Sequence, residues 1–330
     1  MLAAIMLVAC EKQIDIDVED MESQVVVKAQ NEVGTPLSMS LTYSRPAYGS
    51  YYIRYGEDYF TKITNATVTL SVNGAATETA TSNDGTYSFA HIPQPGEVLE
   101  LSIAVPGRDK VTATAMVPTQ PNISNIDTSY SYNGDYSYYY LQQNISFTLS
   151  DPSAHDDYYS VRLREVDTVV YIHRDDDGNT TGTDTTYEEY YRFFECTDYL
   201  LVSNVGVDLD DPTSARTFSG TEMLFTDATI NGMSHNIKIK DLNDRYWENI
   251  YDEKSYDSTA IHSHLYLEVT SLSRDLYLYR QTMNSYSDDE LLGFFSEPVQ
   301  VHSNIKGGIG IFGVSSKSTF FIPSRPVTSY

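Results

Sequence analysis

The segment NATVTLSVNG, residues 65–74, decides the fold class. Every second side chain in it is apolar, which places these side chains on one face of a β-strand. They are Ala66, Val68, Leu70 and Val72. Asn73-Gly74 follows, and both residues tolerate the positive φ angles of a tight hairpin turn. The segment therefore predicts a strand with one buried face that turns back into a second strand.

The same alternation continues after this hairpin. Residues 83–89 combine an Asn-Asp-Gly turn with two aromatic side chains on one face, and alternating stretches follow at residues 99–105 and 111–117. Short strands separated by turn residues are typical of a β-sandwich. We therefore expect a sandwich over residues 24–118. Its boundary is the segment 118–121, where two prolines remove amide donors from any sheet.

Residues 119–330 continue the β pattern and are expected to form a second, larger β-rich domain. The candidate strands cover residues 145–149, 159–166, 168–173, 187–194, 235–239 and 262–270. One helix is predicted over residues 273–286, because Ser273 can cap it and Leu276, Tyr279 and Met283 share one face. The predicted fold class is all-β, with one notable helix.

The first ten residues, MLAAIMLVAC, contain an apolar run that is too short to cross a bilayer but fits the core of a signal peptide. Leu7-Val-Ala-Cys10 resembles the lipobox of bacterial lipoproteins, in which the cysteine receives fatty acyl chains such as palmitate. We therefore expect residues 1–10 to be a signal peptide ending at a lipidated Cys10, and residues 11–23 to be an acidic tether. Because no basic residue precedes Glu11, we expect the signal peptide to begin upstream of Met1.

The chain is strongly acidic, with 46 Asp and Glu against 21 Lys and Arg and a formal net charge of −25. Binding to nucleic acid needs clustered basic side chains, so that class of partner is excluded. The charge also disfavours a basic patch on anionic lipid, which leaves the acyl chains as the expected membrane link. Cys196 has no intramolecular partner once Cys10 is lipidated, and we expect it to be a buried strand residue.

Tyrosine is unusually frequent, with 28 residues against one tryptophan. Six tyrosines fall within residues 130–140, and they are the predicted binding surface, because a tyrosine ring combines rigid apolar area with a hydroxyl. The alternative is a Tyr-rich strand or loop that packs on the body. The six residues are Tyr130, Tyr132, Tyr136, Tyr138, Tyr139 and Tyr140.

Two motifs resemble ligand sites but are better explained by structure. Gly308–Gly313 matches GxGxxG, yet a strand pattern follows it where a dinucleotide site needs a helix, so we interpret it as close backbone approach. The acidic segment 175–184 lacks the glycine position of an EF-hand loop and is expected to be a hairpin tip.

His262 and His264 would face the same side of a strand, but a metal site needs further ligands. His235, His302 and Asp257 are the residues that might converge with them, and nothing in the spacing shows that they do. We therefore predict no catalytic residues, no metal and no cofactor, and we expect a protein that is not an enzyme.

Two resemblances add to these expectations. Ala66-Thr-Val68, Asp84-Gly-Thr-Tyr87 and Pro95-Gly96 resemble prealbumin-like (Ig-like) and carboxypeptidase-regulatory-like sandwich modules. Over the whole chain, the lipobox, the Ile-Asp-Ile-Asp run after it and the segment 295–313 resemble the domain-of-unknown-function family 4249 of outer-membrane lipoproteins. That resemblance implies a surface-exposed outer-membrane lipoprotein associated with SusC-like TonB-dependent transporters, and it supplies no catalytic residues.

The expected function is therefore that of a non-catalytic accessory or ligand-capture partner of a TonB-dependent transporter barrel. Two alternatives stay open. An adhesin-like or structural surface lipoprotein would bind host or matrix proteins without a transporter. A hydrolase would need carboxylates or histidines that converge only in three dimensions.

Overall fold

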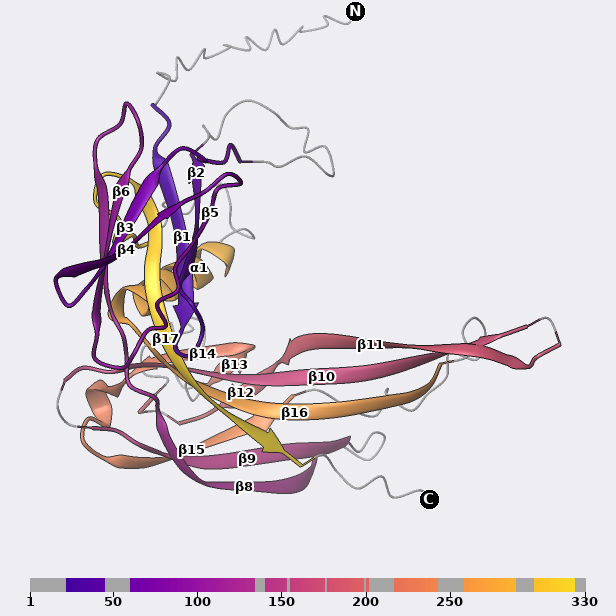
Figure 1. Ribbon diagram of the computed structural model, residues 1–330. Coiled ribbons are helices and arrows are strands. Elements are labelled where there is room, and N and C mark those ends of the chain that lie inside the picture. The colour runs from indigo at the N-terminus through magenta and orange to yellow at the C-terminus, as the bar shows by residue number, and fades with distance from the viewer. Residues whose placement is uncertain are drawn as a thin grey trace, which may run out of the picture.

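The computed structural model describes residues 22–44, 60–133, 140–152, 155–175, 177–198, 200–201, 217–242, 258–288 and 300–323. These residues form three β-sheets and one α-helix, which confirms the predicted all-β class. An eight-stranded sheet runs through the whole structure, and a four-stranded and a five-stranded sheet pack on it. The result is two β-sandwiches that share one sheet (Figure 1).

The N-terminal sandwich pairs the four-stranded sheet, of order β4-β3-β6-β7, with one part of the eight-stranded sheet. The four strands are β3 (Thr67–Val72), β4 (Ala75–Thr81), β6 (Val98–Ala104) and β7 (Val111–Met116). The facing strands near the N-terminus are β1 (Val25–Glu32), β2 (Ser38–Tyr43) and β5 (Thr86–Ser88). The predicted hairpin is confirmed, because Asn73 and Gly74 join β3 to β4 with φ angles of 53° and 82°.

The C-terminal sandwich pairs the five-stranded sheet, of order β13-β12-β15-β9-β8, with the rest of the eight-stranded sheet. The five strands are β8 (Asn122–Asn133), β9 (Tyr140–Ser150), β12 (Phe194–Cys196), β13 (Phe218–Gly220) and β15 (Ser234–Asp241). The facing strands are β10 (Tyr158–Arg174), β11 (Thr180–Arg192), β14 (Glu222–Thr226), β16 (Ser258–Leu272) and β17 (Ile309–Ile322). The two helical elements are η2 (Asp227–Thr229), a 3-10 turn, and α1 (Arg274–Asp288).

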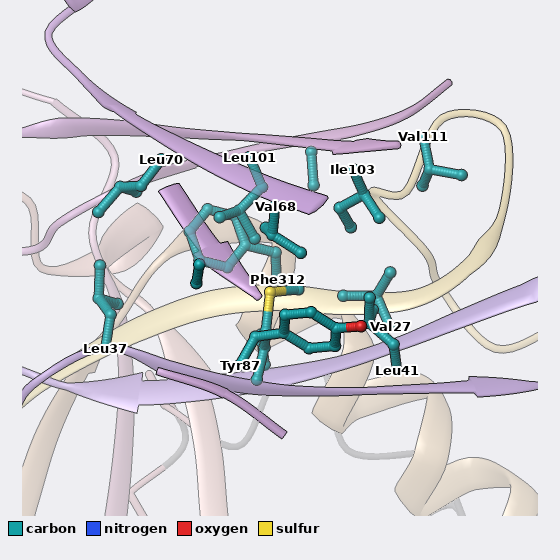
Figure 2. Close-up of a cluster of buried hydrophobic side chains, with 14 of the residues drawn as sticks. Val27, Leu37, Leu41, Val68, Leu70, Tyr87, Leu101, Ile103, Val111 and Phe312 are labelled. Carbon is teal, nitrogen blue, oxygen red and sulfur yellow. The ribbon is translucent and has the colours of Figure 1, made fainter. Parts of the chain in front are cut away.

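Strand β17 belongs to both sandwiches. Its first half pairs with β1 in parallel and its second half pairs with β16 in antiparallel, and Ser315 lies in both ladders. Phe312 lies in the N-terminal core, as Figure 2 shows, whereas Ile322 lies in the C-terminal core. Both residues are even-numbered, so one face of β17 covers both cores. The predicted boundary at residues 118–121 falls between β7 and β8, and β17 joins the units on its two sides.

Glycines in β17 allow its neighbours to approach closely, as the sequence indicated. Gly310 has a φ of 112°, and a Cβ there would lie 2.0 Å from the carbonyl oxygen of Val27 on β1. A Cβ at Gly313 would lie 2.6 Å from the Cβ of Leu276 on α1. The motif therefore lies at the start of β17, which contacts β1 and α1, and the strand continues to Ile322 where a dinucleotide site would need a helix.

Two sequence-based boundaries differ from the structure. The separate strands predicted at residues 159–166 and 168–173 form the single 17-residue strand β10, because Asp167 keeps its partners Glu188 on β11 and Ser263 on β16. The predicted helix 273–286 is α1, which begins at Arg274, and the Ser273 hydroxyl accepts a hydrogen bond from the backbone N–H of Val314 at 3.2 Å. Within the described part of the chain, no helix combines the length and apolar character of a membrane span.

Replacement of Gly310 by alanine tests how strongly the fold depends on the close approach of β17 to β1. We expect Gly310→Ala to lower the free energy of unfolding by about 3 kcal/mol or more, because a strained φ costs about 1–3 kcal/mol before any clash is counted. Gly34→Ala is the matched control, since Gly34 has a φ of 93° but nothing within 4 Å of its Cβ position. Urea denaturation measures both; equal losses in the two variants would contradict the role given to the contact.

Candidate functional site

A row of four side chains crosses the outer face of the eight-stranded sheet, which is the face turned away from the C-terminal core. Val161 and Leu163 of β10 point into that core, so the alternate residue Arg164 points outward. Arg164 is in register with a tyrosine on each side, and the row continues to β17. In strand order, the row is Tyr191 on β11, Arg164 on β10, Tyr266 on β16 and Phe321 on β17.

The rings of this row are accessible and oriented by one another. The exposed fractions of Tyr191 and Phe321 are 41% and 54%. The Arg164 guanidinium lies 4.8 Å from the ring centre of Tyr266, and the Tyr266 and Phe321 rings meet edge to face at 6.0 Å. His264 stands beside Phe321, with ring centres 5.9 Å apart. The outer face thus offers a band of aromatic surface with a cation between its rings.

The charges along this row are paired. Arg164 donates hydrogen bonds to Glu268 at 2.7 Å and to Glu189 at 3.3 Å. Lys317 lies 3.6 Å from the same Glu268 and 3.3 Å from Glu32. In a chain with a net charge of −25, this face is therefore locally close to neutral.

A groove of about 360 Å³ adjoins the Tyr191 end of the row. Its floor holds Glu222, which pairs with Arg162 at 2.7 Å and with Arg280 of α1 at 2.8 Å. Arg162 also lies over the Tyr191 ring at 4.8 Å. Burial, together with the nearby Arg162, lowers the pKa of Arg280. Further lining residues are Phe193, Phe218, Ser219, Gly220, Thr221 and Asn284.

Three tyrosines of the predicted surface, Tyr130, Tyr132 and Tyr140, lie on strands β8 and β9 of the five-stranded sheet. Tyr130 is 37% exposed, and its hydroxyl donates a hydrogen bond to the carbonyl oxygen of Pro323 at 3.3 Å. Tyr132 and Tyr140 belong to β8 and β9, and only their backbone is described. Tyr136, Tyr138, Tyr139 and the lipidation candidate Cys10 lie outside the described residues. The binding role of this cluster stays a prediction.

The histidines that might have formed a metal site lie apart. His235 contacts Asp198 at 2.5 Å, and His302 contacts Asp275 on α1 at 2.9 Å, whereas His264 lies on the aromatic band. Asp257 and the side chain of His262 lie outside the described residues.

The acidic segment 175–184 spans the turn between β10 and β11 and the first residues of β11, as expected for a hairpin tip. Asp175 Oδ1 accepts hydrogen bonds from the backbone amides of Asp177 and Asn179 at 3.1 and 2.8 Å. These bonds lower the pKa of Asp175, and they occupy this oxygen within the turn itself.

Three buried carboxylates that the sequence analysis missed come together at one end of the C-terminal sandwich. Oxygen atoms of Asp151, Asp157 and Asp227 lie within 4.8 Å of one another. Tyr159 donates a hydrogen bond to Asp151 at 2.6 Å. Burial, reinforced by neighbouring carboxylates, raises the pKa of both Asp157 and Asp227. Such oxygens are ligands that Ca²⁺ prefers, but no local motif links Asp151 and Asp157 to the distant Asp227.

A second buried polar group joins the two sheets of the C-terminal sandwich. Arg192, at the end of β11, is fully buried and pairs with Glu165 of β10 and, at 2.9 Å, with Asp241 of β15. Ser263 of β16 donates a further hydrogen bond to Glu165. Burial alone would raise the pKa of Glu165, but the hydrogen bonds from Arg192 and Ser263 outweigh it and hold that pKa below its ordinary value. Glu165 therefore acts as a structural anion and not as a proton donor.

Removal of the buried guanidinium tests this structural role. We expect Arg192→Met to lower the free energy of unfolding by about 3–5 kcal/mol, because Glu165 and Asp241 would stay buried without their partner. Arg108→Met is the control, since Arg108 forms an ion pair with the exposed Glu22 at 2.5 Å and such pairs contribute about 1 kcal/mol or less. Chemical denaturation compares the two; a loss as small as that of Arg108→Met would show that the buried network is dispensable.

Neutralising one carboxylate of the Asp151–Asp157–Asp227 cluster tests whether these charges repel one another. We expect Asp157→Asn to raise the melting temperature at pH 7. At this pH the charged form of Asp157 and Asp227 is disfavoured in the folded chain, as their raised pKa values show, so removing one charge stabilises the fold. The unfolded chain loses these protons at about pH 4, so the gain should vanish below that pH.

Thermal melts in EDTA and in millimolar Ca²⁺ provide the control. A wild-type melting temperature that rises with Ca²⁺, together with a destabilised Asp157→Asn variant, would show that a cation offsets the repulsion and would contradict the prediction.

No curated protein matches the chain. The family model described as "Domain of unknown function (DUF4249)" matches residues 11–320, which is nearly the whole chain and ends within β17. The chain therefore belongs to the DUF4249 family.

Proposed function

We propose that the chain is a lipid-anchored protein of the outer-membrane surface that acts as a non-catalytic accessory or ligand-capture partner of a TonB-dependent transporter. The observation that carries this proposal is the separation of two regions of the molecule. The described chain begins at one end of the N-terminal sandwich, whereas the exposed aromatic band lies on the C-terminal sandwich.

The first region is the end at which a tether would attach. Glu22 and Ser23 lie against the β6–β7 loop, where Arg108 contacts both side chains. Glu22, Ser23 and Arg108 line a surface groove, and Gly307, just before β17, lines it too. The 14 residues of β17 lead from here to Phe321 and Ile322, and at 3.3 Å per residue they span about 45 Å. An anchor at Cys10 would therefore join the described body at the end of the molecule remote from Phe321.

The second region, the aromatic band, lies at the base of an arm formed by β10, β11 and β16, which Figure 1 shows projecting sideways from the junction of the sandwiches. These strands have 17, 13 and 15 residues, well beyond the usual five or six. Nearly all of β11 is exposed, and β11 forms the edge of its sheet. Because a projecting edge strand adds little to core packing and leaves backbone groups unpaired, such an arm is suited to contact with another protein.

The burial of the carboxylates that come together in the described residues also favours a binding role over a catalytic one. The carboxylates of Asp151, Asp157 and Asp227 converge, but all three side chains are buried. Glu165 is held as an anion by Arg192. Neither arrangement offers a substrate an accessible proton donor and acceptor pair.

Purification from native membranes in mild detergent, followed by mass spectrometry, tests the proposal. We expect a TonB-dependent barrel to copurify in near-stoichiometric amount, and the purified chain to carry the mass of acyl chains on Cys10. We expect the Cys10→Ala variant to be absent from the membrane fraction. The Cys196→Ala variant changes a buried thiol on β12 and should remain in that fraction.

A chain that keeps its membrane location but purifies without a barrel would contradict the transporter role. A Cys10→Ala variant that stays in the membrane fraction would contradict the lipid anchor.

A further inference from the structure

We infer that the outer face of the eight-stranded sheet binds an uncharged glycan, laid across the strands along the row Tyr191–Arg164–Tyr266–Phe321. This inference rests on the proposed function in one respect only: it names the ligand that the proposed ligand-capture role would bind. The aromatic band and the charges around it are the observations that carry it.

The shape of the site comes from the pleated sheet. The four side chains stand on four adjacent strands in one register row, so they lie on a nearly straight line. With strands about 4.8 Å apart, the line from Tyr191 to Phe321 measures roughly 14 Å. This length accommodates more than one sugar ring, which suits a segment of a longer chain.

The aromatic rings provide the stacking surface. The C–H groups on one side of a sugar ring carry partial positive charge and pack against the negative face of an aromatic ring. Tyr191 and Phe321 expose 41% and 54% of their area, and Tyr266 is held between Arg164 and Phe321. Rings fixed by their neighbours lose little conformational freedom when a ligand binds.

The polar groups between the rings match sugar hydroxyls. Arg164 offers a planar set of donors, and Glu189 offers carboxylate acceptors on the exposed β11. Both are already oriented by their mutual ion pair at 3.3 Å. Donors and acceptors side by side bind hydroxyl groups, which both donate and accept hydrogen bonds.

Charge decides between an uncharged and an anionic glycan. Each cation on this face has a carboxylate partner: Arg164 pairs with Glu268, and Arg162 pairs with Glu222. The rest of the chain brings the net charge to −25 and repels polyanions. An uncharged chain of sugars avoids that repulsion and leaves the ion pairs intact.

The backbone argues against an extended peptide on this face. The two inner strands of the row, β10 and β16, are paired on both sides, so their amides and carbonyls lie in the plane of the sheet and are used by the ladders. The free edge of β11 lies beside the row and not on this face. A peptide strand would instead need a free edge. Only side chains are available on the face, and rings with planar charged groups are the chemistry that recognises sugars.

Affinity gel electrophoresis of the purified full chain in gels that contain one polysaccharide tests this inference. The probes are dextran, amylopectin, galactomannan and xyloglucan, with polygalacturonate as the anionic comparison. We expect retardation by at least one uncharged probe and none by polygalacturonate. The double variant Tyr191→Ala/Phe321→Ala should weaken the binding at least tenfold while its melting temperature stays near that of the wild type.

Two control variants separate this surface from others. Phe60→Ala removes a ring of similar exposure, 50%, from the N-terminal region and should leave retardation unchanged. Tyr130→Ala tests the tyrosine cluster on β8. Loss of binding in Tyr130→Ala but not in the double variant would overturn the assignment to this face.

The remaining outcomes are equally decisive. Retardation by none of the uncharged probes would overturn the inference, even if a transporter barrel copurifies and the proposed function holds. A dimer in light scattering that the double variant dissociates would show that a second copy covers the face, and this also overturns it. Binding to an uncharged probe without a copurifying barrel would support the glycan site and contradict the transporter role.

Discussion

The double pairing of β17 is the constraint on which the rest of the structure depends. One strand completes the N-terminal sandwich through β1 and the C-terminal sandwich through β16, and its even-numbered side chains enter both cores. Gly310 makes this possible, because only glycine lets β17 pass the Val27 carbonyl. A rotation between the sandwiches would have to break this ladder, so a continuous strand fixes the distance from the start of β17 to the aromatic band.

The buried Arg192 network solves a related problem at the base of the arm. There the chain leaves β11 in one sheet and enters β12 in the other, and Arg192 ties β10 to β15 at that crossing. Buried ion pairs seldom stabilise more than well-packed apolar groups would, but they specify position strongly. Arg164 and Tyr191 come directly before Glu165 and Arg192 on β10 and β11. The network thereby sets the register in which these two side chains point outward into the aromatic row.

Local patterns predicted much of the fold. The alternation around Asn73-Gly74, the helix at 273–286 and the buried Cys196 all follow from nearest-neighbour rules, and the structure confirms them. The parallel pairing of β1 with β17 could not be predicted, since strand order depends on long-range packing. For the same reason Tyr191, Arg164, Tyr266 and Phe321 looked unrelated in sequence, and the three aspartates that converge near Tyr159 carried no shared motif. The tyrosine run at 130–140 stood out because it is contiguous, whereas the aromatic row is assembled from four strands.

The position of β17 also has a consequence for biosynthesis. Asn31 of β1 accepts a hydrogen bond from Ser315 of β17 across 284 residues of sequence. A ribosome delivers β1 long before β17 exists, so the sandwich whose synthesis begins first cannot close until nearly the whole chain has been made. Until then β1 presents an unpaired strand edge, which is a template for aggregation. Holdase chaperones should therefore matter more for this chain than for a protein whose domains close in order of synthesis.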